Sequence, residues 1–318
     1  MYISDFRPIR HADQLMQRAI ELTQATGIRT LSVAVAQNEE VLEAARDAQQ
    51  QGLARSILVG DEQKIHELMD SLGMSRGDYE VLHEPDIDAA ASKAVRLADD
   101  GHADVLMKGV VPTATLLRLV LSREFRLRGR SILSHTAILD VPGYHKLLGL
   151  TDAGMVPKSD LRQRIDILRN AVTVMHALGI SRPKVAMIAA VDHINLAMPV
   201  SMEAAIIAKM SERGQIEGAI VDGPMSFDMA TCGTPADIED YNSPVAGDAD
   251  LLVVDTLETG NILVKSLSVL TRAVFGGVIV GARIPLSLVS RSDSAQNKMT
   301  SIALSILVAD HLKLGAAK

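Results

Sequence analysis

Several residue types that carry much of protein chemistry are scarce in this chain of 318 residues. There is no Trp, and aromatic residues of all kinds make up 3% of the sequence. Single-stranded nucleic acids bind by stacking their bases on aromatic rings, so this composition argues against such ligands. The one cysteine, Cys232, excludes an intramolecular disulfide and a metal site built from several cysteines.

The sequence also lacks an excess of positive charge, because its formal net charge is −7. Binding a nucleic-acid backbone needs a basic surface, so we expect no nucleic-acid partner, although a local group of Lys and Arg could hold a small phosphorylated ligand. The N-terminus does not resemble a signal peptide, and no apolar run is long enough to span a membrane. We therefore expect a soluble, cytoplasmic protein with no membrane partner.

Common nucleotide and metal motifs are absent too. The sequence has no Walker A pattern, no G-x-G-x-x-G after an expected strand and no H-E-x-x-H. These absences weaken the kinase, NAD-dependent dehydrogenase and metallohydrolase hypotheses. We expect no bound metal.

The chain instead has 47% hydrophobic residues, enough for sizeable cores. Short apolar runs alternate with stretches of helical periodicity, which indicates βαβ units and a mostly parallel sheet. The expected strands are residues 31–36, 56–60, 79–83, 103–109, 131–140, 184–190, 218–223, 249–255 and 276–282.

The length fits two α/β domains. Residues 140–159 are rich in Gly and Pro, so the boundary is expected there. We predict a first domain of residues 1–140 plus about 294–318, and a second of residues 141–293. Ligands would bind in a cleft between them, at the carboxyl ends of strands.

The stretch PLSLVSRSDSAQNKMTSIALSIL passes from a strand to a helix. The first turn of a helix attracts anions, Arg291 offers a planar fork of donors that matches phosphate, and Ser290 adds a hydroxyl. The alternative is a capped helix with a solvated Arg291, in which Asp293 (with Gln296) or Ser292 is the cap. One face of this helix carries Met299, Ile302, Ile306 and Ala309.

Other polar positions follow expected strands. Lys108 could contact an anion or lie on the surface, and His135, inside an apolar strand, is read as a core histidine with its hydrogen bonds satisfied. The remaining candidates for lining the cleft belong to a Gly-Pro turn, a Gly-Asn loop and the helix after that loop. They are Gly223, Pro224, Gly260, Asn261 and Lys265. Each could equally belong to a plain strand–helix connection.

Seven motifs together resemble one family, the phosphate acetyltransferases and phosphate butyryltransferases, and its butyryltransferase-like branch in particular. They are ADVLMKG, LSHTAILDVPGY, NAVTVMHALGI, GQIEGAIVDGP, SPVAGDADLLVVD, GNILVKSL and LVSRSDSAQNKMTSIAL. The resemblance implies two α/β domains, related to the isocitrate dehydrogenase-like fold, and a homodimer. It also implies reversible acyl transfer between coenzyme A and inorganic phosphate, with acyl-CoA as substrate and no bound cofactor.

The resemblance also implies roles for single residues. Arg291 would bind phosphate, and Ser290 would hydrogen-bond the reacting carbonyl or phosphate. The family's acetyltransferases have an aspartate seven positions after that serine, where this chain has Asn297. Lys298, beside it, would then favour the thiolate of coenzyme A, and Asp293 is a substitute base.

Other functions stay open at this point. Because Asn297 replaces the aspartate, one alternative is that this chain is a non-catalytic relative of the family. Such a protein would bind coenzyme A or acyl phosphate and regulate another process. An NAD-dependent decarboxylating dehydrogenase is a further alternative because of the related fold, and a protein–protein scaffold is another. The sequence does not rank acetyl against butyryl substrates, because one methylene changes binding by only ~1–3 kcal/mol.

Overall fold

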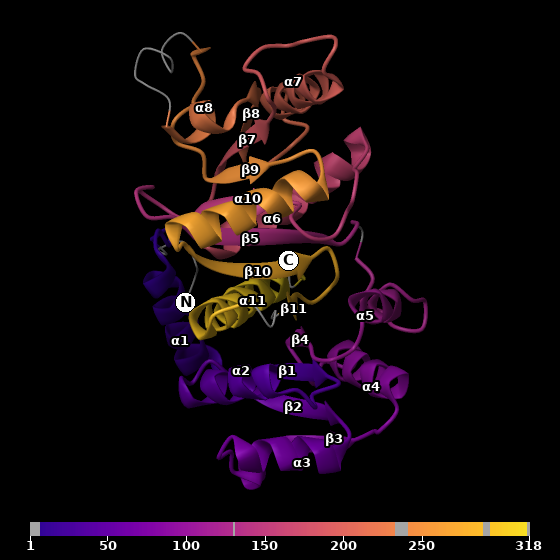
Figure 1. The fold of residues 1–318 in the computed structure, drawn as a ribbon. Helices are drawn as coiled ribbons and strands as arrows, with labels where there is room; N and C mark the ends of the chain where they lie inside the picture. Colours follow the sequence, from indigo (N-terminus) through magenta and orange to yellow (C-terminus); the bar gives the residue numbers. More distant parts are fainter. Residues whose placement is uncertain (1–6, 130, 233–240, 289–292, 317–318) are drawn as a thin grey trace. The chain divides into compact units, whose positions relative to one another are not determined.

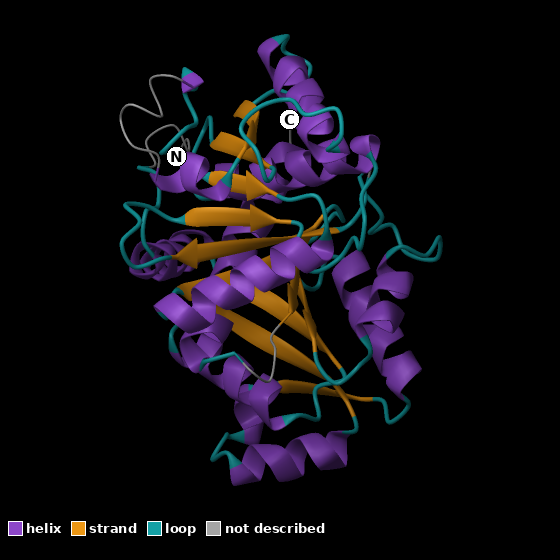
Figure 2. Ribbon diagram, turned by 45° about the horizontal axis from the view of Figure 1, so that its top comes forward, coloured by secondary structure: helices purple, strands orange, loops and turns teal. Residues whose placement is uncertain are grey.

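The computed structural model describes residues 7–129, 131–232, 241–288 and 293–316, and it confirms the predicted α/β class with mostly parallel strands (Figures 1 and 2). The chain divides into two compact units. Unit 1 contains residues 1–12 and 131–275, and unit 2 contains residues 13–130 and 276–318. No helix in the described part of the chain is both long and apolar enough to cross a membrane.

Unit 2 is built on a sheet in the order β3-β2-β1-β4-β11-β10, in which β10 pairs antiparallel with β11 and the other neighbours are parallel. Its strands are β1 (Arg29–Ala34), β2 (Ala54–Gly60), β3 (Glu80–His83), β4 (Val105–Lys108), β10 (Val274–Val280) and β11 (Leu286–Leu288). Its helices are α1 (Ala12–Thr26), α2 (Glu39–Gln50), α3 (Glu62–Ser71), α4 (Ile87–Asp99), α5 (Thr113–Val120) and α11 (Ala295–Ala316), with a 3-10 turn η2 (Arg76–Asp78).

Unit 1 has a sheet in the order β5-β6-β9-β7-β8, in which only the β5–β6 pair is antiparallel. Its strands are β5 (Ser134–Asp140), β6 (Leu148–Thr151), β7 (Lys184–Ile188), β8 (Ile220–Met225) and β9 (Leu251–Val253). Its helices are α6 (Leu161–Ala177), α7 (Pro199–Glu212), α8 (Phe227–Cys232) and α10 (Leu257–Thr271).

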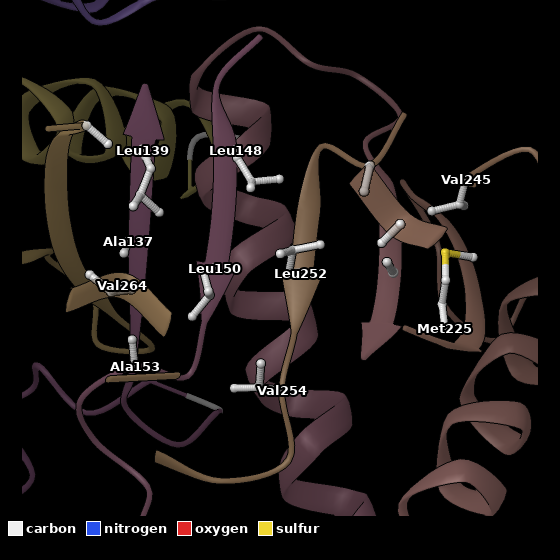
Figure 3. Packing of buried hydrophobic residues seen from close by; sticks show 14 of the residues in the cluster. Ala137, Leu139, Leu148, Leu150, Ala153, Met225, Val245, Leu252, Val254 and Val264 are labelled. Atoms are coloured by element: carbon white, nitrogen blue, oxygen red, sulfur yellow. The ribbon is translucent and has the colours of Figure 1, made fainter. Parts of the chain in front are cut away.

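The core of unit 1 lies between this sheet and its helices. Helices α10 and α6 contact β5 and β6, with α10 in front of the strands and α6 behind them (Figures 1 and 3). Figure 3 shows the side chains of Leu139, Leu150, Leu252 and Val264 in one apolar cluster, and all four are at most 7% exposed. This cluster orders the strand ends that carry the polar residues of the unit.

Helix α11 of unit 2 is buried all round along most of its length, because twelve consecutive residues, 298–309, are buried. The predicted apolar face of Met299, Ile302, Ile306 and Ala309 is part of this run. The hydroxyl of Ser301 donates to the carbonyl oxygen of Asn297 and accepts from the backbone N–H of Gly277. A hydroxyl folded back in this way lets a polar residue lie in a buried helix.

All nine strands expected from the apolar runs are present. Residues 140–159, where the domain boundary was predicted, contain β6, whose four residues pair with β5. The predicted division of the chain placed residues 131–140 in the first domain and 276–293 in the second. In the structure, residues 131–140 belong to unit 1 together with residues 141–275, and residues 276–293 belong to unit 2. The reason is that β5 pairs with β6 and β11 pairs with β4.

Candidate active site

Lys108 lies at the carboxyl end of the unit 2 sheet, level with the last residues of the two neighbouring strands. In the parallel register, Ala34 of β1 and Leu288 of β11 flank it. Its ammonium donates hydrogen bonds to the carbonyl oxygens of Gly109 (3.0 Å) and Val111 (3.2 Å). Lys108 therefore holds the turn after β4 and carries a positive charge to this edge.

The turn after β4 needs a glycine for steric reasons. A Cβ atom at Gly109 would lie 2.1 Å from the carbonyl oxygen of Val35, and the N–H of Gly109 donates to the carbonyl oxygen of Ala34 at 2.9 Å. Val35 itself has φ of +62°, a conformation that is strained for a β-branched residue. Strain of this kind clusters at ligand sites, which supports a functional role for this edge.

The segment predicted to bind phosphate enters from Leu288, beside Lys108, and continues at Asp293. Ser290 and Arg291 lie outside the described residues, so their predicted roles stay predictions. Asp293 is half-buried. The expected cap of α11 was Asp293 or Ser292, but the side chain of Ser294 makes a capping contact, accepting from the N–H of Asn297 at 3.2 Å.

Lys298, also in the first turn of α11, is only 7% exposed. Neighbouring Asn297 is half-buried, and its carbonyl oxygen accepts from the hydroxyl of Ser301. A carboxamide cannot act as a base at that position. The structure thus places Lys108, Asp293 and Lys298 in the same unit.

Gly223 and Pro224 lie inside β8, so the prediction that they form a turn after the strand is wrong. Proline is tolerated here because β8 is the edge strand of its sheet. Gly223 has φ of +148°, and a Cβ atom would lie 2.7 Å from the carbonyl oxygen of Met187. The carbonyl oxygen of Pro224 accepts from the hydroxyl of Tyr241 at 2.5 Å.

Gly223 also lines a pocket of about 520 Å³ beside β8 and α7. Its charged lining residues are Arg182, Lys209, Glu212 and Asp222. Because two cations face two carboxylates, and Lys209 is paired with Glu212 at 2.6 Å, this pocket has no net preference for anions.

Gly260 and Asn261 belong to helix α10, and the predicted Gly-Asn loop with free N–H groups is wrong at Gly260. The N–H of Gly260 donates to the carbonyl oxygen of Thr256, whose side chain caps the helix. A Cβ atom at Gly260 would lie 2.2 Å from the carbonyl oxygen of Asp152, so this glycine permits close packing. Asn261 and, one turn on, Lys265 are exposed.

Asp152 was missed by the sequence analysis, although it lies at the carboxyl end of β6. Its carboxylate accepts from the N–H groups of His135, Gly154, Met155 and Val156, at 2.9 to 3.2 Å. Burial raises the pKa of Asp152 above its ordinary value, although these donors oppose the shift. The local sequence T-D-A-G is typical of a turn in which the aspartate side chain accepts hydrogen bonds from the backbone N–H groups that follow it.

His135 is half-buried in β5, and contrary to the prediction its hydrogen bonds are not all satisfied. Its Nδ1 atom is inaccessible and has no hydrogen-bond partner among the residues described. Burial lowers the pKa of His135 to about 4, so the imidazole is neutral at physiological pH. Within the described ranges, no three His, Cys, Asp or Glu side chains are grouped as metal ligands.

The fold is of the α/β class. In unit 2, Lys108 ends strand β4 and Lys298 lies in the first turn of helix α11. The fold is shared with an acyltransferase of known structure. The branched-chain phosphotransacylase from Enterococcus faecalis V583 aligns with a TM-score of 0.79 and 33% identity, over 89% of this chain and 99% of that one.

The sequence comparisons agree. The family described as "Phosphate acetyl/butaryl transferase" matches residues 78–306, and the chain belongs to this family of phosphate acyltransferases. It is 45% identical to the phosphate butyryltransferase of Clostridium acetobutylicum over 89% of this chain and 94% of that protein. It is 39% identical to the phosphate acetyltransferase of Rhizobium meliloti over 92% of each. The predicted acyltransferase class is thereby confirmed.

Proposed function

We propose that the chain catalyses reversible transfer of a short aliphatic acyl group between coenzyme A and inorganic phosphate. The observation that carries the proposal is the 45% identity to a phosphate butyryltransferase over 89% of this chain. The cationic carboxyl edge of unit 2, where Lys108 is level with Leu288, supports it, because both substrates are anions.

The proposed reaction needs positive charge and hydrogen-bond donors. A phosphate oxygen attacks the thioester carbonyl, a C–O bond forms, the C–S bond breaks and coenzyme A leaves as the thiolate. Negative charge develops on the carbonyl oxygen and then on sulfur, and donors fixed at those atoms lower the barrier. We assign phosphate binding to Arg291, the carbonyl hydrogen bond to Ser290, and additional positive charge to Lys108 and Lys298.

In this mechanism the thiol of coenzyme A can lose its proton without a dedicated general base. A free thiol has a pKa near ~8.5 and is partly ionised at neutral pH, and nearby cations increase that fraction. Asp293, half-buried at the start of α11, is the proposed acceptor in the direction that consumes coenzyme A. Asn261 and Lys265, both exposed on α10, are proposed contacts for coenzyme A.

Three finer points also belong to the proposal. Butyryl-CoA is the proposed preferred substrate, since the identity to a butyryltransferase (45%) exceeds that to an acetyltransferase (39%). The resemblance to the family supports a homodimer and a cytoplasmic location. No resident cofactor takes part in the proposed reaction.

The test measures release of the coenzyme A thiol from acetyl-, propionyl- and butyryl-CoA, with and without phosphate. We expect release that depends on phosphate and is fastest with butyryl-CoA. Folded protein that releases no thiol from any of the three would contradict the proposal. Fastest release from acetyl-CoA would keep the reaction and reverse the proposed chain-length preference.

A further inference from the structure

Helix α10 of unit 1 exposes large apolar side chains. Among the residues that the structure describes, Ile262 is 65% exposed, Val269 is 72% exposed and Leu270 is 82% exposed. Single exposed apolar residues are ordinary on a protein surface. Three of them on one helix of 15 residues need an explanation, because a surface helix normally turns polar residues to water.

The apolar residues lie on the outward side of α10. Its buried residues are Gly260 and Val264, and the helix contacts β5 and β6. Each residue turns the helix by about 100°, so Ile262 and Val269, about two turns apart, lie opposite that buried side, and Leu270 borders them. Figure 1 shows α10 across the front of the unit 1 strands, with no described helix or strand of that unit in front of it.

Opposite charges mark the two ends of this outward side. Glu258 lies in the first turn of α10 and Arg272 is its C-cap residue. Both are exposed, and neither side chain has a hydrogen bond or ion pair with another residue in the described ranges. About four helical turns, or ~21 Å, separate them. The carboxylate and the guanidinium are therefore too far apart to pair within one helix.

A second copy of the same helix would satisfy both ends. If two copies of α10 lie antiparallel about a two-fold axis near Ser266, Ile262 of one copy meets Val269 of the other, and Glu258 meets Arg272. Each contact then occurs twice, as in any interface made by the same surface of two identical chains. The small side chain of Ser266 allows close approach at the axis, and antiparallel helices oppose their dipoles favourably.

We propose that the outward side of α10 binds a second copy of this chain as an antiparallel helix pair, with Ile262, Val269 and Leu270 at its centre. Glu258 of each copy pairs with Arg272 of the other. The proposal gives a surface to the homodimer, and it rests on the exposed residues of α10 and not on the proposed activity. A different protein is less well matched, because nothing would require its charges to mirror those of α10.

The experiment measures the dimer dissociation constant by sedimentation equilibrium. It compares the wild-type chain with Val269→Asp, with the charge reversals Glu258→Arg and Arg272→Glu, and with the double reversal. The matched control is Ile206→Asp, since Ile206 is an apolar residue on α7 of the same unit and is 46% exposed. Circular dichroism checks that every variant is folded.

We expect the wild-type chain to be a dimer. Val269→Asp should weaken dimerisation by about 30-fold or more, as for a residue at the centre of an interface. Each single charge reversal should weaken it by about five- to tenfold, because like charges then meet at both ends. The double reversal should restore the wild-type affinity, and Ile206→Asp should leave it unchanged.

Three results would overturn the proposal. They are a monomeric wild-type chain, a dimer whose affinity is unchanged in Val269→Asp, and a double reversal that dimerises no better than the single reversals. If Val269→Asp does not fold, the charge variants decide. Failure of the proposed function shows separately, as absent thiol release by a wild-type chain that still dimerises.

Discussion

Two lysines of this protein are equally buried but differ completely in their surroundings. Lys146 and Lys298 are each 7% exposed. The ammonium of Lys146, in unit 1, lies 2.8 Å from a carboxylate oxygen of Asp248, 2.7 Å from one of Asp250 and 2.9 Å from the carbonyl oxygen of Asp248. The ammonium of Lys298, in unit 2, forms no hydrogen bond or ion pair with such an oxygen among the described residues.

Lys146 belongs to an ion-pair network that holds unit 1 together, whereas no ion pair of Lys298 is present among the described residues. Around Lys146, Lys184 also pairs with Asp248 at 2.6 Å, and its N–H donates to Asp250 at 2.7 Å. His145 contacts Asp248 as well, at 2.7 Å. This network ties the amino ends of the unit 1 strands, whereas Lys298 lies at a helix start where substrates are proposed to bind.

The largest effect on stability is expected from removing the ammonium of Lys146, which pairs with Asp248 and Asp250. Lys146→Met should lower the free energy of unfolding by about 3–5 kcal/mol, because it leaves a buried carboxylate without its cation. Urea-induced unfolding of the whole chain, followed by circular dichroism, measures the change. Lys209→Met, in the same unit and in an exposed pair with Glu212, is the matched control and should change stability little, since an exposed pair contributes ~0–1 kcal/mol. A loss no greater than that of the control would contradict the network.

A smaller effect should come from the coupling inside the network. A double-mutant cycle of Lys146→Met and Asp250→Asn is expected to show a coupling free energy of ~0.5–3 kcal/mol. The reason is that the two side chains contact each other directly, at 2.7 Å. Unfolding free energies of the two single variants and the double variant provide the measurement. Strict additivity would show that the two residues act independently.

The smallest effect is expected at Asp248, whose side chain is 40% exposed. Burial tends to raise its pKa, but hydrogen bonds from Lys146, Lys184 and His145 outweigh this and hold the pKa of Asp248 below its ordinary value. A lowered folded-state pKa stabilises the fold above the unfolded value, ~3.9, and this stabilisation is lost as pH falls through the folded value.

Asp248→Asn should therefore be less stable than the wild type near pH 6, and the gap should shrink below about pH 4. Melting curves of both proteins across this pH range would test the sign. The raised pKa of Asp152 affects both proteins alike and cancels in the difference. A gap that widens on acidification would mean that the carboxylate of Asp248 does not gain stability from its cations.

Much of the fold was predictable from local pattern, because apolar runs and helical periodicity reflect burial directly. The exception is β6, whose sequence LGLT is short and lies among glycines and prolines. Antiparallel pairing with β5 makes it a strand, and pairing of this kind has no local signature. Gly260 was misread for a similar reason, since its close neighbour is the carbonyl oxygen of Asp152, 108 residues earlier.

The sequence by itself determined the order of strands and helices and, through seven motifs, the family of phosphate acyltransferases to which the chain belongs. It also marked Lys108 and Lys298 as cations near strand ends and helix starts. Only the tertiary structure decided which lysines are neutralised. The partner of Lys146 lies 102 residues away along the chain, and it is brought close because β6 and β7 both pair with β9. Periodicity is a property of neighbours in sequence, whereas the pairing of a charge depends on which strands become neighbours in space.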